Sequence, residues 1–272
     1  MSTWIKEGGS WKKATTNSIK VNGHWVDAPT TFIKVNGKWE DVNALPISFE
    51  MEVEATAKPT FPLMKGKLIV TDLTGGKYNV KGYGNIDEPR LKDTTITTAV
   101  VKNMHSVGYM NHMWEDCINL TSVIYEQGLT YNVSINGIFN FAKNCVKLTH
   151  LDMSPLIGCK ILYAGSAFKN CKVLPALDVS ALDFSDEKLD LGSMAENCGA
   201  LKKINMSING DKPKVLNMFK GCNVLECLSN LNTVGSTGNM FLTSPKLVSP
   251  DAATLTKLRS SAGFKYEKGS AC

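Results

Sequence analysis

The residues with the most chemical potential in this 272-residue chain are its eight cysteines and four histidines. Five cysteines recur at steps of 28, 26, 27 and 24 residues, at Cys117, Cys145, Cys171, Cys198 and Cys222. A zinc site needs cysteines or histidines grouped within a few residues of one another, and these cysteines lack that spacing. A free cysteine usually behaves as a small buried hydrophobe. We therefore predict that the repeated thiols are buried and bind no metal, and that the protein needs no cofactor.

His112 and Cys117 together suggest a nucleophile with its base. Cys117 occupies the same repeated position as the other four cysteines, however, and buried thiols are unreactive. Asp152 and Asp178 also hold a regular repeat position, which indicates hydrogen bonding in turns rather than an acid and base pair for glycoside hydrolysis. Glycine-rich spots such as Gly75-Gly76 fit hairpin turns and lack the spacing of a phosphate-binding loop. The sequence therefore predicts that the protein is not an enzyme.

The cysteines belong to a longer repeat, whose fold determines where the candidate residues lie. Its most complete copies are FAKNCVKLTHLDMS at 141–154 and AFKNCKVLPALDVS at 167–180. The alternation at the end of each copy predicts a short strand, in which Leu151 and Met153 point inward and their neighbours point outward. Each copy would thus contribute one strand to a sheet.

The first half of each copy has a different spacing. Phe168, Cys171 and Leu174 follow one another as residues on one face of a helix would, so one or two helical turns are predicted opposite the strand. No copy can bury its apolar face alone, and several copies must therefore stack. We predict a solenoid with a parallel sheet over residues 107–248.

The outward positions of the predicted strands form a candidate ligand-binding face. Small polar side chains on a rigid sheet suit hydrogen bonding to sugar hydroxyls or to the edge of another protein. The alternative is a solvated face without a ligand. The loops at 125–137 and 180–193 are predicted to carry specificity, because insertions in repeat proteins collect on one face. The candidate ligand-binding residues are His150, Asp152, Asp178, Lys203 and Asn205.

Residues 1–44 contain a second repeat, with a period of 14 residues. Two copies, IKVNGHWVDA and IKVNGKWEDV, place Asn-Gly between alternating residues, which is a strong signal for a β-hairpin. A single hairpin of this size is only marginally stable. We therefore predict that Trp11, Trp25 and Trp39 pack on neighbouring hairpins or on other copies of the chain. This segment would serve attachment or oligomerisation.

Two further segments flank the predicted solenoid. Residues 45–106 alternate at period two and break at glycines, which predicts a small β-rich domain that either caps the solenoid or stands alone as a spacer. In residues 249–272, Ser249-Pro250 precede a helix-forming run, so a short helix is predicted to close the array before a polar tail. The predicted fold class is mainly β with short helical turns.

Composition narrows the classes of function. The formal net charge of +5 rests on 30 Lys plus Arg, among which only Arg90 and Arg259 are arginine. This mild, lysine-dominated excess argues against nucleic-acid binding. No apolar run reaches about 18 residues, which argues against membrane insertion, and the first residues lack the apolar middle of a secretion signal. We expect a protein that stays in a cytosol-like compartment unless lysis releases it.

The cysteine repeat resembles the BspA-like class of leucine-rich repeats over residues 107–248. This resemblance implies a right-handed solenoid, with no catalytic residue at the repeat positions. The hairpin repeat of residues 1–44 is similar to the short Trp-containing repeats in tail-fibre and other virion proteins of bacteriophages. Together the two resemblances imply a virion protein that is assembled in the host cytoplasm and released by lysis.

The resemblances leave several roles open. The leading hypothesis is a tail-fibre or adhesin protein that contacts other virion proteins through residues 1–44 and a host-surface glycan or protein through its repeats. The analogy with fibres suggests a homotrimer. One alternative is a collar, neck or whisker decoration protein whose partners are virion proteins, and another is a bacterial BspA-like surface adhesin, against which the missing export signal counts. An enzyme, such as a depolymerase on a phage fibre, is the least favoured hypothesis, after the virion proteins and the bacterial adhesin.

Overall fold

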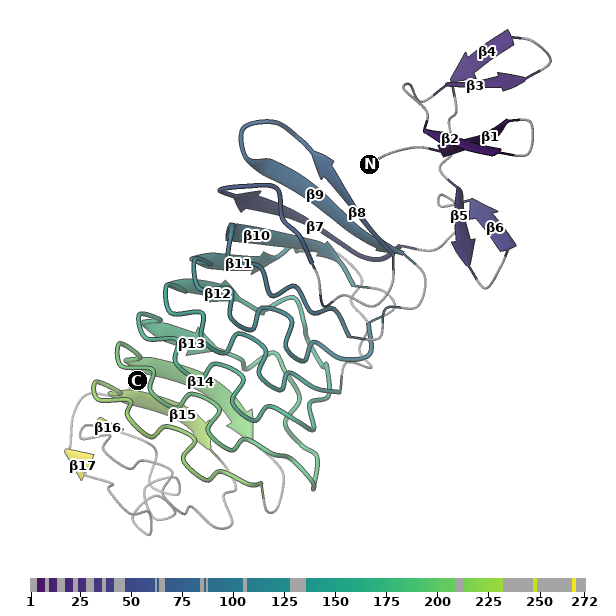
Figure 1. The fold of residues 1–272 in the computed structure, drawn as a ribbon. Helices are drawn as coiled ribbons and strands as arrows, with labels where there is room; N and C mark the ends of the chain where they lie inside the picture. The colour runs from purple at the N-terminus through teal and green to yellow at the C-terminus, as the bar shows by residue number, and fades with distance from the viewer. Residues whose placement is uncertain are drawn as a thin grey trace. The chain divides into compact units, whose positions relative to one another are not determined.

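The structure is a computed structural model with two compact units, Met1–Pro46 and Ile47–Cys272 (Figure 1). In the first unit it describes the backbone of six strands. In the second it describes residues 47–61, 63, 67–83, 86, 88–104, 107–127, 136–208 and 213–226 with their side chains, and the backbone of strands at 227–231, 247–248 and 266–267.

The first unit contains three antiparallel hairpins. They pair β1 (Trp4–Glu7) with β2 (Ser10–Lys13), β3 (Ser18–Val21) with β4 (His24–Asp27), and β5 (Phe32–Val35) with β6 (Lys38–Asp41). The register is the same in all three, so that Lys6, Lys20 and Lys34 lie opposite Trp11, Trp25 and Trp39. The side-chain packing predicted for these three tryptophans lies outside the described residues.

The second unit begins with a six-stranded sheet in the order β12-β11-β10-β7-β9-β8. Its strands are β7 (Ile47–Ala55), β8 (Lys67–Asp72), β9 (Lys77–Tyr83), β10 (Ile96–Asn103), β11 (Ser122–Tyr125) and β12 (His150–Asp152). The pairs β8–β9, β9–β7 and β7–β10 are antiparallel, whereas β10–β11 and β11–β12 are parallel. The cap segment, residues 47–103, therefore shares one hydrogen-bonded sheet with the first predicted repeat strand, β11.

A second parallel sheet follows, with β13 (Ala176–Asp178), β14 (Lys203–Ile208) and β15 (Cys227–Leu231). Figure 1 shows β10 to β15 stacked in chain order. The repeat strands do not form one continuous parallel sheet as predicted, because β12 and β13 belong to different sheets.

Pro175 explains this break between the sheets. The residue four positions after each repeat cysteine donates its backbone N–H to the preceding unit, as Thr149 does to the Thr121 carbonyl at 2.9 Å and Lys202 to the Pro175 carbonyl at 2.8 Å. Proline has no N–H, so the corresponding bond from position 175 cannot form. The ladder is interrupted at the one described unit that carries proline there.

The prediction of helical turns opposite the strands is wrong, since the described residues contain no helix. In one unit Asn140, Ala142 and Asn144 donate their backbone N–H groups to carbonyls of the next unit at 2.7 to 3.1 Å. The residues between them, Phe141 and Lys143, donate instead to carbonyls three positions earlier. Asn140 and Asn144 have φ of 53° and 65°. Such left-handed residues cannot continue a right-handed helix, and the units are joined by a ladder of turns instead.

The core of the second unit is a single apolar cluster that runs from the cap through the stacked units. Phe141 and Phe168 of successive units pack edge to face, with ring centroids 6.0 Å apart. Leu151 and Met153 point inward as predicted, with exposed fractions of 8% and 0%. Alternation at period two was therefore sufficient to identify the inner face of the strands.

The end of the chain contains one further described pair, β16 (Leu247–Val248) with β17 (Tyr266–Glu267), which is parallel. The helix predicted after Ser249-Pro250 lies outside the described residues.

Candidate functional site

The five candidate ligand-binding residues lie on the outward side of the repeat strands, but they divide into two groups. His150 and Asp152 belong to β12 in the first sheet, whereas Asp178, Lys203 and Asn205 belong to β13 and β14 in the second. His150, Asp178 and Lys203 are exposed, and Asp152 and Asn205 are half-buried. Asp152 and Asp178 do not stand on adjacent hydrogen-bonded strands, because the break at Pro175 lies between β12 and β13.

The two aspartates of this face serve the turns that follow their strands, as predicted. Oδ1 of Asp152 accepts the backbone N–H of Ser154 at 2.9 Å. Oδ1 of Asp178 accepts both the backbone N–H and the hydroxyl of Ser180, at 3.0 and 2.7 Å, while its Oδ2 accepts Nδ2 of Asn205 at 3.1 Å. Partial burial would raise the pKa of Asp178, but these hydrogen bonds outweigh it and hold the pKa below its ordinary value.

The two loops predicted to carry specificity are described to different extents. Most of the loop at 125–137 lies outside the described residues. In the loop at 180–193, Asp183, Asp186 and Asp190 each accept the backbone N–H of the residue two positions later, at 2.8 to 3.0 Å. This loop is therefore held by its own aspartates.

The opposite side of the repeats, here called the turn face, carries a continuous ladder of side-chain amides. The residue before each repeat cysteine has φ between 62° and 77°, and it is Asp116, Asn144, Asn170, Asn197 and Gly221 in turn. Nδ2 of each asparagine donates to the preceding member of the ladder, at 2.7, 2.7 and 3.1 Å. Asparagine suits both demands, because it tolerates the left-handed region and carries a donor and an acceptor.

The two ends of the amide ladder are closed differently. At the first end, Nζ of Lys92 lies 2.9 Å from Oδ2 of Asp116. Partial burial would raise the pKa of Asp116, but the hydrogen bonds from Asn144 and Lys92 outweigh it and lower the pKa. At the other end a Cβ on Gly221 would come within 2.6 Å of Oδ1 of Asn197, so glycine is the residue that fits there.

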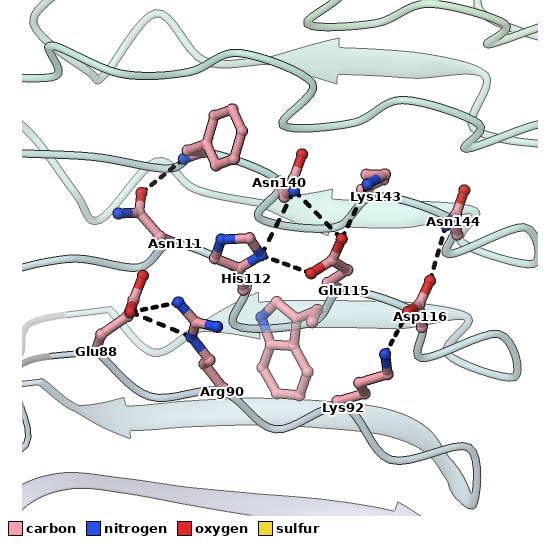
Figure 2. Close-up of polar contacts among 12 residues, drawn as sticks. Glu88, Arg90, Lys92, Asn111, His112, Glu115, Asp116, Asn140, Lys143 and Asn144 are labelled. Carbon is pink, nitrogen blue, oxygen red and sulfur yellow. Dashed lines mark hydrogen bonds and ion pairs between the residues drawn. The ribbon is translucent and has the colours of Figure 1, made fainter. Parts of the chain in front are cut away.

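A second ladder of charged side chains runs beside the first, two residues before each cysteine, and Figure 2 shows its first pair, Glu115 and Lys143. Glu115 accepts Nζ of Lys143 at 3.1 Å, and Glu196 lies 2.8 Å from Nζ of Lys169 and 3.4 Å from that of Lys220. Nδ1 of His112 is bonded to Oε2 of Glu115 at 2.5 Å. Glutamate thus pairs with lysine between units, except at the step from Lys143 to Lys169, where both side chains are cationic. His112 contacts this carboxylate and has no contact with the thiol of Cys117 among the described interactions.

The repeat cysteines are fully buried, with exposed fractions of 0%. The thiols of Cys145, Cys171, Cys198 and Cys222 each donate to a backbone carbonyl of the preceding unit at 3.0 to 3.2 Å. Burial raises the pKa of Cys117 and Cys222 to about 12, and that of the three thiols between them well above the ordinary value. The arrangement suits packing and a weak hydrogen bond, and it does not activate a nucleophile.

Sequence reasoning missed one further stacked segment. The carbonyl of Thr97 accepts the N–H of Thr121 at 2.7 Å, as that of Thr121 accepts the N–H of Thr149 one unit later. Asp93 stands near the cysteine of the first unit, and its N–H lies 3.4 Å from Sγ of Cys117. Residues 91–103 therefore stack as an additional unit. With an aspartate in place of cysteine, the segment lacks the strongest repeat signal, and only Ile96-Thr97 matches Leu120-Thr121 and Leu148-Thr149 of the following units.

No described group of three or more His, Cys, Asp and Glu side chains is placed to hold a metal ion. Among the described residues there is also no helix long and apolar enough to cross a membrane. Comparisons with protein-family models, curated proteins and solved structures found no match to the chain.

Proposed function

We propose that this chain is a non-enzymatic virion protein in which a leucine-rich-repeat solenoid of the BspA-like class presents a surface for recognition of the host. In this proposal the hairpins of Met1–Pro46 attach the protein to other virion proteins and support oligomerisation, for which a homotrimer is the expected state. The protein would act as a tail-fibre or adhesin component.

One observation carries the proposal. Equivalent strand positions repeat where they face the core, whereas the first outward position of each strand varies. The inward residues Leu151, Leu177 and Ile204 are all aliphatic and buried, whereas the outward residues preceding them are histidine, alanine and lysine. A scaffold with a constant interior and a variable outward position suits recognition, because that surface side chain can change without loss of the core.

The ladders of the turn face support the same role. The units donate several backbone N–H groups to their neighbours, and three of them also donate the side-chain amide of an asparagine. Such a scaffold holds its surface groups in fixed positions, which lowers the entropy lost when a partner binds. The buried thiols with raised pKa favour a structural role for the cysteines over chemistry.

The test is binding of the full-length, fluorescently labelled protein to a panel of intact candidate host bacteria. We expect saturable binding to particular hosts, and a trimeric mass in light scattering. Replacing Trp11, Trp25 and Trp39 together with alanine should dissociate the oligomer and lower the apparent affinity through loss of multivalency, while the same hosts are still recognised. A well-folded protein that binds no host would overturn the recognition role in favour of a collar or decoration protein.

A further inference from the structure

A row of three aromatic side chains, of which two are exposed and Tyr109 is half-buried, runs along the turn face, apart from the strand positions considered above. Tyr109, Phe139 and Tyr163 lie in three successive units, six or eight residues before the repeat cysteine. Phe139 is 41% exposed and Tyr163 is 46% exposed, although every other described phenylalanine except the half-buried Phe61 is buried. Adjacent rungs of such a stack are about 4.8 Å apart, so the row extends over about 10 Å.

Glycines in the following units make room for two of these rings, those of Tyr109 and Phe139. A Cβ on Gly165 would lie 3.3 Å from two ring carbons of Phe139, and one on Gly137 would lie 3.3 Å from Cδ1 of Tyr109. The rings therefore rest on glycine backbone, and a larger residue at either position would push them away. His112 packs edge-on against Phe139, with ring centroids 5.5 Å apart, which further fixes its orientation.

Polar groups stand at both ends of the aromatic row. Tyr163 forms a β-bridge with Asp190, whose Oδ1 accepts the N–H of Gly192 at 2.9 Å and whose Oδ2 lies 3.8 Å from Nζ of Lys214. At the other end Asn111 accepts the backbone N–H of Phe139 at 2.7 Å through Oδ1. Figure 2 shows Asn111 next to His112. Carboxylate, ammonium and amide groups thus flank the rings.

We propose that this row is a glycan-binding site, which takes a short stretch of a pyranose polysaccharide along the stacking direction. One face of a pyranose ring presents C–H groups that pack on an aromatic face, while its hydroxyls at the rim need hydrogen-bond donors and acceptors. Rings fixed on glycine and flanked by Asp190 and Asn111 match that combination. This inference rests on the proposed recognition function and assigns the ligand to the turn face.

The experiment measures binding of the full-length protein to an array of hexose and N-acetylhexosamine oligosaccharides and to purified host surface polysaccharides, followed by calorimetric titration of the best ligand. Phe139→Ala and Tyr163→Ala should each raise Kd by about tenfold, the scale expected for loss of one stacked ring. Leu216→Ala is the matched control, because Leu216 occupies the position of Phe139 in a later unit and is 56% exposed. It should leave Kd unchanged within about twofold.

Gly165→Val provides a second variant, since it displaces the ring of Phe139 without removing it and should weaken binding similarly. Thermal unfolding of each variant confirms that it is folded. The proposal is overturned if the wild-type protein binds none of the glycans, or if Leu216→Ala weakens binding as much as Phe139→Ala. Host-cell binding that survives both aromatic substitutions and periodate oxidation of the cell-surface sugars would overturn the glycan site while leaving the recognition function standing, with a protein as receptor.

Discussion

The turn face and the strand face of the repeats share one period but are held together differently. On the turn face, backbone ladders and the amide ladder from Asp116 to Asn197 link the units from Cys117 to Cys198 without a break. On the strand face, pairing stops between β12 and β13 at Pro175. The comparison indicates that stacking is maintained by the turn face, so that the strand face can tolerate an interruption.

The largest expected effect on stability comes from substitutions that create a cavity in the core behind each face. Phe168→Ala should lower the free energy of unfolding by about 3 to 5 kcal/mol, because the ring is fully buried and packs on Phe141 of the preceding unit. Leu177→Ala behind the strand face should cost about 2 to 5 kcal/mol. Urea denaturation measures both, and a smaller loss for Phe168→Ala than for Leu177→Ala would contradict the greater importance assigned to the turn face.

The amide ladder predicts the next largest effect. Asn170→Ala removes two side-chain hydrogen bonds, to Asn144 and from Asn197, and places alanine at φ of 64°. Left-handed geometry costs about 1 to 2 kcal/mol and each of the two hydrogen bonds contributes about 0.5 to 1.5 kcal/mol, so we expect a loss of about 2 to 5 kcal/mol. Asn170→Gly keeps the backbone geometry and should lose about 1 kcal/mol less. Equal losses in the two variants would show that backbone strain plays no part.

The buried thiols should contribute a smaller amount. Cys171→Ala removes the hydrogen bond from Sγ to the carbonyl of Ala142 at 3.2 Å and leaves a small cavity, for an expected loss of about 1 kcal/mol. Chemical denaturation measures it.

Alkylation gives an independent check on the same thiols. Since the pKa of Cys117 is raised to about 12, its thiolate stays scarce at pH 9, and iodoacetamide should label it only after denaturation. Rapid labelling of the repeat cysteines in the native protein, located by mass spectrometry, would refute the buried arrangement.

Repairing the break on the strand face should change stability only slightly. Pro175→Thr restores an N–H that can donate to the Thr149 carbonyl, and this hydrogen bond is worth about 0.5 to 1.5 kcal/mol. The substitution also removes the restriction that proline places on the unfolded chain, which costs about 0.4 to 1 kcal/mol of stability. The net change should lie within about 1 kcal/mol, and hydrogen exchange should show a protected amide at position 175. An amide that exchanges as fast as one in an open loop would mean that something other than proline separates β12 from β13.

Asp178 should produce the smallest effect, confined to acid pH. The pKa of Asp178 is lowered in the folded protein. Its contribution to the free energy of unfolding is therefore complete above the unfolded pKa of about 3.9, and it is lost as the pH falls through the folded pKa. Solvent screening of this exposed group limits the contribution to less than about 1 kcal/mol. Ser180→Ala removes the hydroxyl donor and should raise the pKa of Asp178 in an NMR titration, whereas an unchanged pKa would show that the other donors suffice.

The local patterns of the sequence predicted some features correctly. Alternation identified Leu151 and Met153 as inward, and the recurrence of cysteine marked buried positions. The helical prediction was wrong because a spacing of three fits two structures. Phe168, Cys171 and Leu174 are linked by bonds from each N–H to the carbonyl three residues earlier, at 3.1 and 3.3 Å, and this pattern belongs to successive turns as well as to a helix.

The candidate site was predicted less well than the fold. Asp178 and Asn205 do meet across neighbouring strands, but His150 and Asp152 lie on the other side of the break at Pro175. The amide ladder had a visible signal in the sequence, since asparagine, aspartate or glycine precedes every repeat cysteine. The aromatic row had none, because Tyr109, Phe139 and Tyr163 occupy two different repeat positions.

The sequence by itself determined the period of the repeat, the inward face of the strands and the burial of the cysteines, because each depends on the spacing of neighbouring residues. Only the tertiary structure decided where each backbone N–H finds its acceptor. Those acceptors lie in a neighbouring unit, 25 residues further along the chain for Asn140 with Gly165 and 28 residues back for Thr149 with Thr121. Local spacing does not specify such partners, and they decide that turns replace helices, that the sheet ends at β12 and that residues 91–103 join the stack.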